Sequence, residues 1–306
     1  MTDQKEFRGV YSIIPTPFTE DDRIDIDGLE KIVEFTVRSG AHGVVTTANA
    51  SEAPYLTEAE RQLVVSTIAK TADGRAAVVV GITASCKKLA CEYGRQALDV
   101  NADAVMAMPP SVQRATEAEI IDYYRGIQDA IELPLFIQNY SGPSGTPMSA
   151  SFLCQLVEKL PQPVYIKEET EFPGPMISQL LELCDDRMLG VMGGKAGRHL
   201  TDEHRRGAIG TMPACEVTDV HAALWRALED GDEKRAAEIY RAVVPLLLFE
   251  TSYGVAVYKE ILRRRGVIEY AGFRQAGGKR LDPGALAELD FICRELKPYL
   301  AGDRWQ

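Results

Sequence analysis

The residue with the clearest chemical potential in this sequence is a lysine at the end of an apolar segment. Lys167 follows Val164–Ile166 in a run that is typical of a buried strand, and lysine rarely points into a core. Burial disfavours the ammonium form and lowers the pKa, which leaves a free amine able to attack a ketone. The protonated imine that results withdraws electrons, so a neighbouring C–H or C–C bond can break. The alternative is a strand-end lysine whose amine reaches solvent.

A carboxylate stands two residues after this lysine. Residues i and i+2 of a strand share a face, so we expect Glu169 beside Lys167 and Glu168 on the opposite face, toward the helices. Glu169 could then pass a proton to a departing hydroxyl. A simple ion pair is the other interpretation, and it would raise rather than lower the pKa of the lysine. The sequence leaves open which of the two effects dominates.

Two further segments carry groups that could serve the same chemistry. Small residues in Ala48–Glu52 form a strand-to-helix turn, whose backbone N–H groups at Asn49, Ala50 and Ser51 can bind a carboxylate. The segment Gln138–Tyr140 ends another apolar run, and its tyrosine could relay protons at the mouth of a barrel. The alternatives are a purely structural turn and a half-buried packing aromatic.

Short β-rich runs that alternate with amphipathic segments must position these residues. The runs are continuously apolar, as in parallel strands buried on both faces. They are Val10–Pro15, Gly43–Thr47, Ala76–Ile82, Ala104–Met108, Pro134–Tyr140, Val164–Glu168, Met188–Gly193 and Ala208–Met212. Eight β-α units predict an α/β fold, a (β/α)8 TIM barrel over residues 1–225, with functional side chains at the carboxyl ends of the strands. A doubly wound sheet is the competing class, but it usually has fewer strands.

The segments between and after these runs have the features of helices. Thr57 with Glu60, and Thr116 with Glu119, have the T-x-x-E spacing of a capping box. The predicted barrel helices include Thr57–Thr71, Cys86–Val100, Thr116–Ile131 and Ser149–Leu160. After Trp225 the strand pattern ends, and residues 226–306 are predicted to form a C-terminal three-helix domain. Its helices are expected over Asp232–Phe249, Tyr253–Arg265 and Pro283–Leu300.

Composition argues against several classes of function. The net charge of −11 disfavours duplex DNA or an anionic membrane as a partner, because there is no basic surplus to neutralise phosphates. None of the six cysteines belongs to a C-x-x-C pair, and most lie in apolar surroundings, where cysteine acts as a small hydrophobe. A reducing cytosol is therefore expected. The polar N-terminus has no apolar signal core, and no run of ~18 apolar residues could span a membrane, so we expect a cytoplasmic protein.

Two other patterns resemble a nucleotide site and a metal site but lack residues that such sites require. Gly193-Gly194-Lys195 resembles the end of a phosphate-binding loop, yet Leu189 and Ala196 occupy positions that such a loop gives to Gly and to Ser or Thr. A loop that holds substrate is favoured over a nucleotide site. His204, Cys215 and His221 lack the spacing of metal ligands. We therefore expect neither a metal nor an organic cofactor.

Several motifs together point to a known family. They are Gly9–Phe18, which ends in T-P-F; L-T-x-x-E-R at Leu56–Arg61; Met108-Pro109-Pro110, with Ser111 where a tyrosine is usual; Tyr165-Ile166-Lys167; and G-A-x-G at Gly207–Gly210. The chain thereby resembles the dihydrodipicolinate synthase and N-acetylneuraminate lyase superfamily of class I Schiff-base lyases over nearly its whole length. The resemblance implies that Lys167 forms the imine. It also implies that Asn49, Ala50, Ser51 and Gly210 bind substrate.

Two departures from the family pattern bear on the activity. The family's G-[ST]-T-G-E carboxylate loop is Ala48–Glu52 here, so its two hydroxyl donors become Asn49 and Ala50. The proton-relay tyrosine of the family falls on Gln138 when counted from Pro134, and on Tyr140 when counted back from Pro143 and Thr146. Both positions have the same strand parity, so periodicity does not decide between them.

Both departures resemble one branch, the 2-keto-3-deoxy-L-arabinonate dehydratases. That branch has an A-N-x-S-E loop, an I-Q-D segment and K-I-E at the lysine, and this chain has Ala48–Glu52, Ile137–Asn139 and Lys167–Glu169. Tyr140 and Ser141 depart from it, since the branch has Ala and Pro there. The resemblance implies that Lys167 attacks C2 of a 2-keto-3-deoxy sugar acid and that water is lost from C3 and C4. Glu169 would assist the hydroxyl, with Tyr140 or a water molecule held by Gln138.

Other readings of the same site stay open. A pyruvate-dependent aldolase, or a condensing enzyme like dihydrodipicolinate synthase, would use the same imine, although Gln138 in place of a tyrosine weakens this reading. An inactive sensor of 2-oxo acids is a candidate of another class, but the presence of Lys167 argues against it. The resemblance further implies a homotetramer built as a dimer of dimers.

Overall fold

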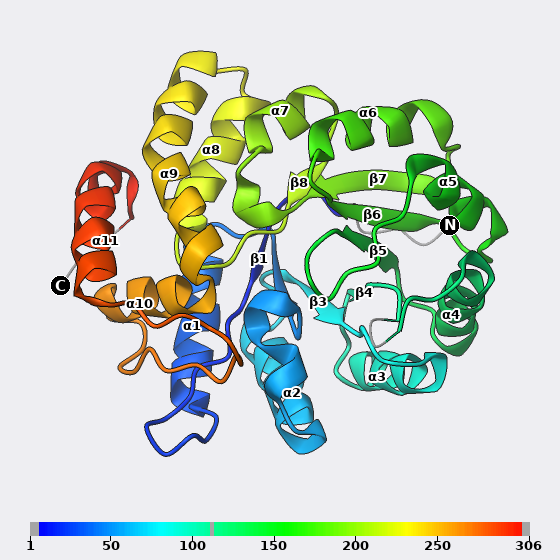
Figure 1. Ribbon diagram of the computed structural model, residues 1–306, viewed down its shortest axis with the longest axis horizontal. Helices are drawn as coiled ribbons and strands as arrows, with labels where there is room; N and C mark the ends of the chain where they lie inside the picture. Colours follow the sequence, from blue (N-terminus) through cyan, green and yellow to red (C-terminus); the bar gives the residue numbers. More distant parts are fainter. Residues whose placement is uncertain (1–5, 111–112, 302–306) are drawn as a thin grey trace.

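Eight parallel strands form a closed barrel (Figure 1). The computed structural model describes residues 6–110 and 113–301, so Ser111 of the sequence motif and the first residues of the polar N-terminus lie outside it. The strands are β1 (Gly9–Ile13), β2 (Gly43–Thr46), β3 (Ala77–Gly81), β4 (Ala104–Ala107), β5 (Leu135–Tyr140), β6 (Val164–Glu169), β7 (Met188–Gly193) and β8 (Gly210–Thr211). They pair in chain order, and β8 pairs with β1. The predicted barrel is confirmed, with β8 shorter than expected.

Helices surround the barrel, and two of them begin at the caps that the sequence predicts. They are α1 (Ile26–Arg38), α2 (Glu58–Ala72), α3 (Lys87–Asp99), α4 (Glu117–Ala130), α5 (Ala150–Lys159), α6 (Pro173–Leu183), α7 (Leu200–Arg205) and α8 (Thr218–Glu229). Thr57 and Thr116 each form a complete capping box with the glutamate three residues later. Each box satisfies free N–H groups of the first turn.

Aromatic side chains fill the barrel at the amino ends of the strands. Phe7, which precedes β1, is buried and lies edge-on against Phe136 and Tyr165, with ring centroids 5.4 and 5.3 Å away. Tyr165 has the same strand parity as Lys167 and Glu169, so these three side chains ascend the inner face of β6. Val164 and Ile166 alternate with them and join the apolar layer between barrel and helices. The interior is thus closed below Lys167 and open above it.

Three helices follow the barrel: α9 (Glu233–Tyr253), α10 (Val255–Arg264) and α11 (Pro283–Leu296). They share an apolar core with α8 and β1, and α9 packs beside α8 (Figure 1). The expected interruption after Phe249 is wrong, because α9 continues to Tyr253 and ends at Gly254, whose φ is 51°. The domain boundary after residue 225 falls within α8 and stays a prediction.

Two of the six cysteines form a bond that the sequence patterns did not predict. Cys154 on α5 and Cys184 at the end of α6 form a disulfide, whereas Cys91, Cys215 and Cys293 are free and buried. The pair lies on neighbouring helices of consecutive β-α units, a proximity that sequence separation conceals. Among the described residues, no helix is long and apolar enough to cross a bilayer.

Candidate active site

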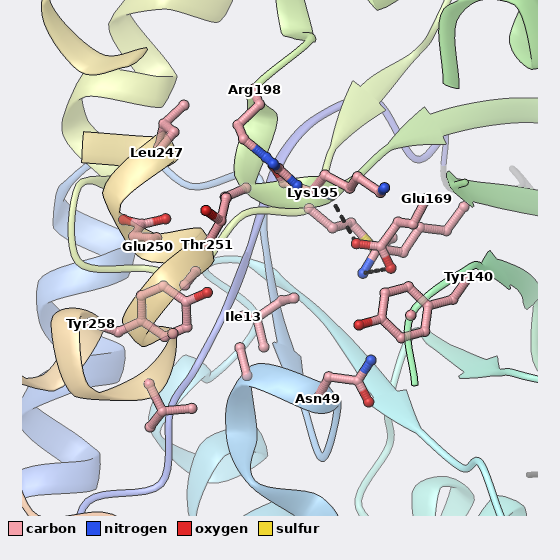
Figure 2. A pocket seen from close by; sticks show the side chains of 18 of the residues that line it. Ile13, Asn49, Tyr140, Glu169, Lys195, Arg198, Leu247, Glu250, Thr251 and Tyr258 are labelled. Atoms are coloured by element: carbon pink, nitrogen blue, oxygen red, sulfur yellow. Dashed lines mark hydrogen bonds and ion pairs between the residues drawn. The ribbon is translucent and has the colours of Figure 1, made fainter. Parts of the chain in front are cut away.

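A cavity of about 370 Å³ opens at the carboxyl ends of the strands, and several predicted site residues line it (Figure 2). Lys167 lies at its base with only 1% of its surface exposed. The other predicted residues on its wall are Asn49, Ala50, Gln138, Tyr140 and Glu169. These residues belong to β5, β6 and the turn after β2, which barrel closure brings together.

Lys167 and Glu169 form an ion pair on the inner face of β6. The distance from Nζ of Lys167 to Oε2 of Glu169 is 3.2 Å, as the shared strand parity predicts. Glu168, on the opposite face, is buried and accepts a hydrogen bond from the Asn139 amide at 2.7 Å. Alternation along one strand therefore separates a cavity carboxylate from a structural one.

Two donors besides the lysine hold the Glu169 carboxylate. The Gln138 amide donates to Oε2 at 2.6 Å, and the backbone N–H of Lys195 donates to Oε1 at 2.9 Å. Burial raises the pKa of Glu169, but Lys167 and these two donors outweigh it and hold the pKa below its usual value. Glu169 is thus an ionised carboxylate at neutral pH, ready to accept a proton.

Strand register answers the question of which residue, Gln138 or Tyr140, adjoins the lysine. Gln138 pairs with Lys167 across β5 and β6, and Tyr140 pairs with Glu169 one layer higher. Both line the cavity, and Figure 2 shows the Tyr140 ring beside Glu169. Burial, and then the charge of Glu169, raise the pKa of the Tyr140 phenol. Tyr140 therefore stays protonated and can donate a hydrogen bond to a ligand.

The turn after β2 contributes only part of its predicted residues to the cavity. Asn49 and Ala50 line it, but Ser51 is not among the lining residues. Ser51 is fully buried, its N–H donates to the Ala48 carbonyl, and its own carbonyl accepts from the Thr16 hydroxyl at 2.7 Å. Ser51 thus supports the turn from beneath.

Gly210 also lies away from the cavity wall. It pairs with Gly9 where β8 meets β1, and a Cβ at this position would stand 2.3 Å from the Gly9 carbonyl oxygen. The glycine is required for close approach of the two strands. Its place explains the G-A-x-G motif by barrel closure.

The comparison with family models decides the relationship. Residues 6–276 match the dihydrodipicolinate synthetase family. The chain belongs to this family. Its members are lyases, so the chain is a lyase of the dihydrodipicolinate synthetase family.

Individual family members cover nearly all of the chain. L-2-keto-3-deoxyarabonate dehydratase of Azospirillum brasilense is 30% identical over 302 residues, which are 97% of this chain and 96% of that protein. 4-Hydroxy-tetrahydrodipicolinate synthase of Methanocaldococcus jannaschii is 28% identical over 243 residues, 79% of this chain and 82% of the relative. The crystal structure of dihydrodipicolinate synthase from Rhodopseudomonas palustris superposes with a TM-score of 0.87 at 27% identity, covering 95% of this chain and 98% of that one.

The loop after β7 also contributes to the cavity, as the sequence pattern at Gly193–Lys195 suggested. Lys195 and Ala196 line the cavity, in agreement with a loop that holds substrate. A Cβ on Gly194 would lie 2.1 Å from Cγ of Glu169, so the glycine lets the loop approach the carboxylate. The Gly193-Gly194-Lys195 pattern thus positions Glu169.

Sequence reasoning missed the contribution of the C-terminal helices to the site. Glu250, Thr251 and Tyr258 line the cavity from α9 and α10, and Arg198 lines it from the segment before α7. No local motif marks these residues. Their place depends on how α9 and α10 pack over the barrel mouth.

Proposed function

We propose that this lyase removes water from a 2-keto-3-deoxy sugar acid through an imine on Lys167. The observation that carries the proposal is the buried Lys167 in contact with an ionised Glu169. An amine beside a carboxylate that can take and return protons is what imine formation and β-elimination require. Gln138 and the Lys195 N–H orient the carboxylate.

The proposed reaction uses one carboxylate for successive proton transfers. Glu169 accepts the ammonium proton of Lys167, and the free amine attacks the C2 ketone. The ketone oxygen leaves as water with that proton and one proton of the amine, and the protonated imine forms. Glu169 then takes a proton from C3, and the resulting enamine expels the C4 hydroxyl, which leaves as water with the same proton. Hydrolysis of the imine frees the product and restores the lysine.

The remaining cavity residues orient the substrate. The carboxylate of a 2-oxo acid would lie against Asn49 and Ala50, which places C2 over the amine. Tyr140 would donate a hydrogen bond to the hydroxyl that leaves. Neither a metal nor an organic cofactor takes part in these steps.

The dehydratase assignment is favoured over the other family activities by the residue that adjoins the lysine. Gln138 stands there and holds Glu169, and the A. brasilense dehydratase is similar to this chain over nearly its full length. A condensing activity is the second candidate, because Tyr140 lines the cavity and the M. jannaschii relative is a synthase. An inactive sensor would leave the Lys167–Glu169 pair without a role.

The test is a panel of 2-keto-3-deoxy pentonates and hexonates assayed for loss of water against release of pyruvate. We expect the substrates to lose water and to release no pyruvate. We also expect no condensation product when pyruvate is incubated with an aldehyde. Release of pyruvate or a condensation product would establish the second candidate instead. Borohydride reduction with pyruvate should add mass to the peptide that contains Lys167, and an adduct elsewhere would contradict the mechanism. The homotetramer and the cytoplasmic location stay predictions.

A further inference from the structure

A buried carboxylate without a donor lies on the side of the cavity away from the lysine. Glu250 of α9 is 4% exposed, lines the cavity, and has no hydrogen-bond donor for either oxygen among the described residues. Figure 2 shows it across the cavity from Glu169 and Tyr140. Buried polar groups are normally satisfied, so a bound group should supply the missing hydrogen bond.

A second acid, Glu216, lies beside Glu250. Burial, followed by the nearby carboxylate of Glu216, raises the pKa of Glu250 well above its usual value, and burial also raises the pKa of Glu216. Two adjacent buried carboxyls share one proton, because both cannot ionise at low cost. The shared proton can satisfy one oxygen of Glu250, and its other oxygen still has no donor among the described residues.

A cationic donor completes this wall. Arg198 lines the cavity, and its Nε donates to the Lys195 carbonyl at 3.0 Å. Within residues 6–110 and 113–301, its terminal amino groups pair with no carboxylate. Glu250 and Arg198 therefore face one cavity, an acceptor and a donor that do not satisfy each other.

We propose that Glu250 and Arg198 form a subsite for a hydroxyl group of the substrate beyond C4. This inference rests on the proposed function and names the part of the substrate that selects it. A hydroxyl accepts from the guanidinium and donates to the carboxylate at the same time. A second carboxylate would be repelled by the Glu216–Glu250 pair, and an ammonium by Arg198. The C-terminal helices thereby select a hydroxylated tail.

The test uses ligands that form the imine but cannot lose water, so it does not depend on dehydration. Borohydride trapping is titrated with 2-oxopentanoate, 2-oxohexanoate and their terminally hydroxylated forms, 5-hydroxy-2-oxopentanoate and 6-hydroxy-2-oxohexanoate. In the wild-type protein, at least one hydroxylated acid should be trapped at a ~10-fold lower concentration than its parent, the 2-oxo acid without the hydroxyl. This is the effect of a hydrogen bond to a charged group. Equal trapping of both pairs would overturn the proposal.

Variants separate the subsite from a merely structural role. Glu250→Leu and Arg198→Met should each abolish the preference for the hydroxylated acid and leave trapping of its parent unchanged. The control is Glu238→Leu, the same change at a partly exposed position of α9 outside the cavity, which should retain the preference. Arg198→Met serves as the second variant if Glu250→Leu does not fold. Equal loss for both acids, or tighter trapping of 2-oxoglutarate than of the hydroxylated acids, would overturn the assignment. Failure of dehydration alone would concern only the proposed function.

Discussion

Among residues 6–110 and 113–301, two lysines are buried, and each lies against a glutamate in a very different setting. Lys167 contacts Glu169 at 3.2 Å and opens onto the cavity. Lys259 of α10 is 0% exposed and contacts Glu52 at 2.5 Å, while its ammonium also donates to the Gly272 carbonyl. The pair of Lys167 and Glu169, called the open pair below, has room for a ligand. The pair of Lys259 and Glu52, called the sealed pair, has its donors and acceptors occupied by protein.

The sealed pair fastens the turn after β2 to the C-terminal helices. The other oxygen of Glu52 accepts from the backbone N–H groups of Arg274 and Gln275 at 2.7 and 2.8 Å. Lys259 also lies 4.3 Å from the centre of the Phe18 ring. Burial lowers the pKa of Lys259 to about 8, although Glu52 opposes this shift. A buried lysine is therefore a candidate for chemistry only when a ligand can reach it.

Replacing each buried lysine should produce the largest difference between the two pairs. Lys259→Met leaves Glu52 buried without its cation, and we expect the free energy of unfolding to fall by ~3–5 kcal/mol. Lys167→Met should cost less, because Gln138 and the Lys195 N–H still hold Glu169. Urea denaturation measures both losses. Only Lys167→Met should abolish borohydride trapping of pyruvate, and an equal stability loss in the two variants would contradict the distinction.

Neutralising the carboxylate of the open pair tests whether it moves protons. Glu169→Gln should retain imine trapping and lower turnover by ~100-fold or more, a typical contribution of general acid–base catalysis. Single-turnover kinetics with the best substrate of the panel separate the two steps. The control is Glu171→Gln at the exposed rim, whose partner is Lys195. Near-normal turnover of Glu169→Gln would remove Glu169 from the mechanism.

A third carboxyl lies behind the open pair and should respond to pH. Burial, followed by the charges of Glu169 and Glu168, raises the pKa of Glu203 to about 8. Between its usual value and pH 8 the unfolded chain binds fewer protons than the folded one, so stability should fall as pH rises through this window and then level off.

Glu203→Gln should remove this part of the pH dependence. We expect the variant to gain stability relative to the wild type as the pH rises from 5 to about 8, the pKa of Glu203 in the folded protein. Thermal unfolding at several pH values measures the gap. A gap that does not change with pH would mean that Glu203 is ionised in the folded protein.

The smallest expected change in stability concerns the turn that the sealed pair supports. Asn49→Leu should weaken the binding of pyruvate and of longer 2-oxo acids alike, since all share the carboxylate. Its stability should change by under ~0.5 kcal/mol, because Asn49 is exposed. Ser51→Ala is the matched variant, and pyruvate affinity should survive it because Ser51 lies beneath the turn. Unchanged affinity in a folded Asn49→Leu variant would place the carboxylate elsewhere.

Local patterns in the sequence predicted the barrel and the open lysine pair. Strand period places Lys167 and Glu169 on one face, and T-x-x-E spacing caps α2 and α4. These features depend on backbone geometry over a few residues, which the order of amino acids specifies directly.

Packing of distant segments decided the rest of the site. Lys259 and Glu52 are 207 residues apart. Cys154 meets Cys184 through the packing of α5 on α6, and Gln138 meets Glu169 through the pairing of β5 with β6. Glu250 and Arg198 line one cavity because α9 packs over the barrel mouth. In the packed structure, Ser51 and Gly210 do not line the cavity. Which face of a strand a side chain occupies is a local property, but which group it then meets depends on the relative position of elements that no local pattern encodes.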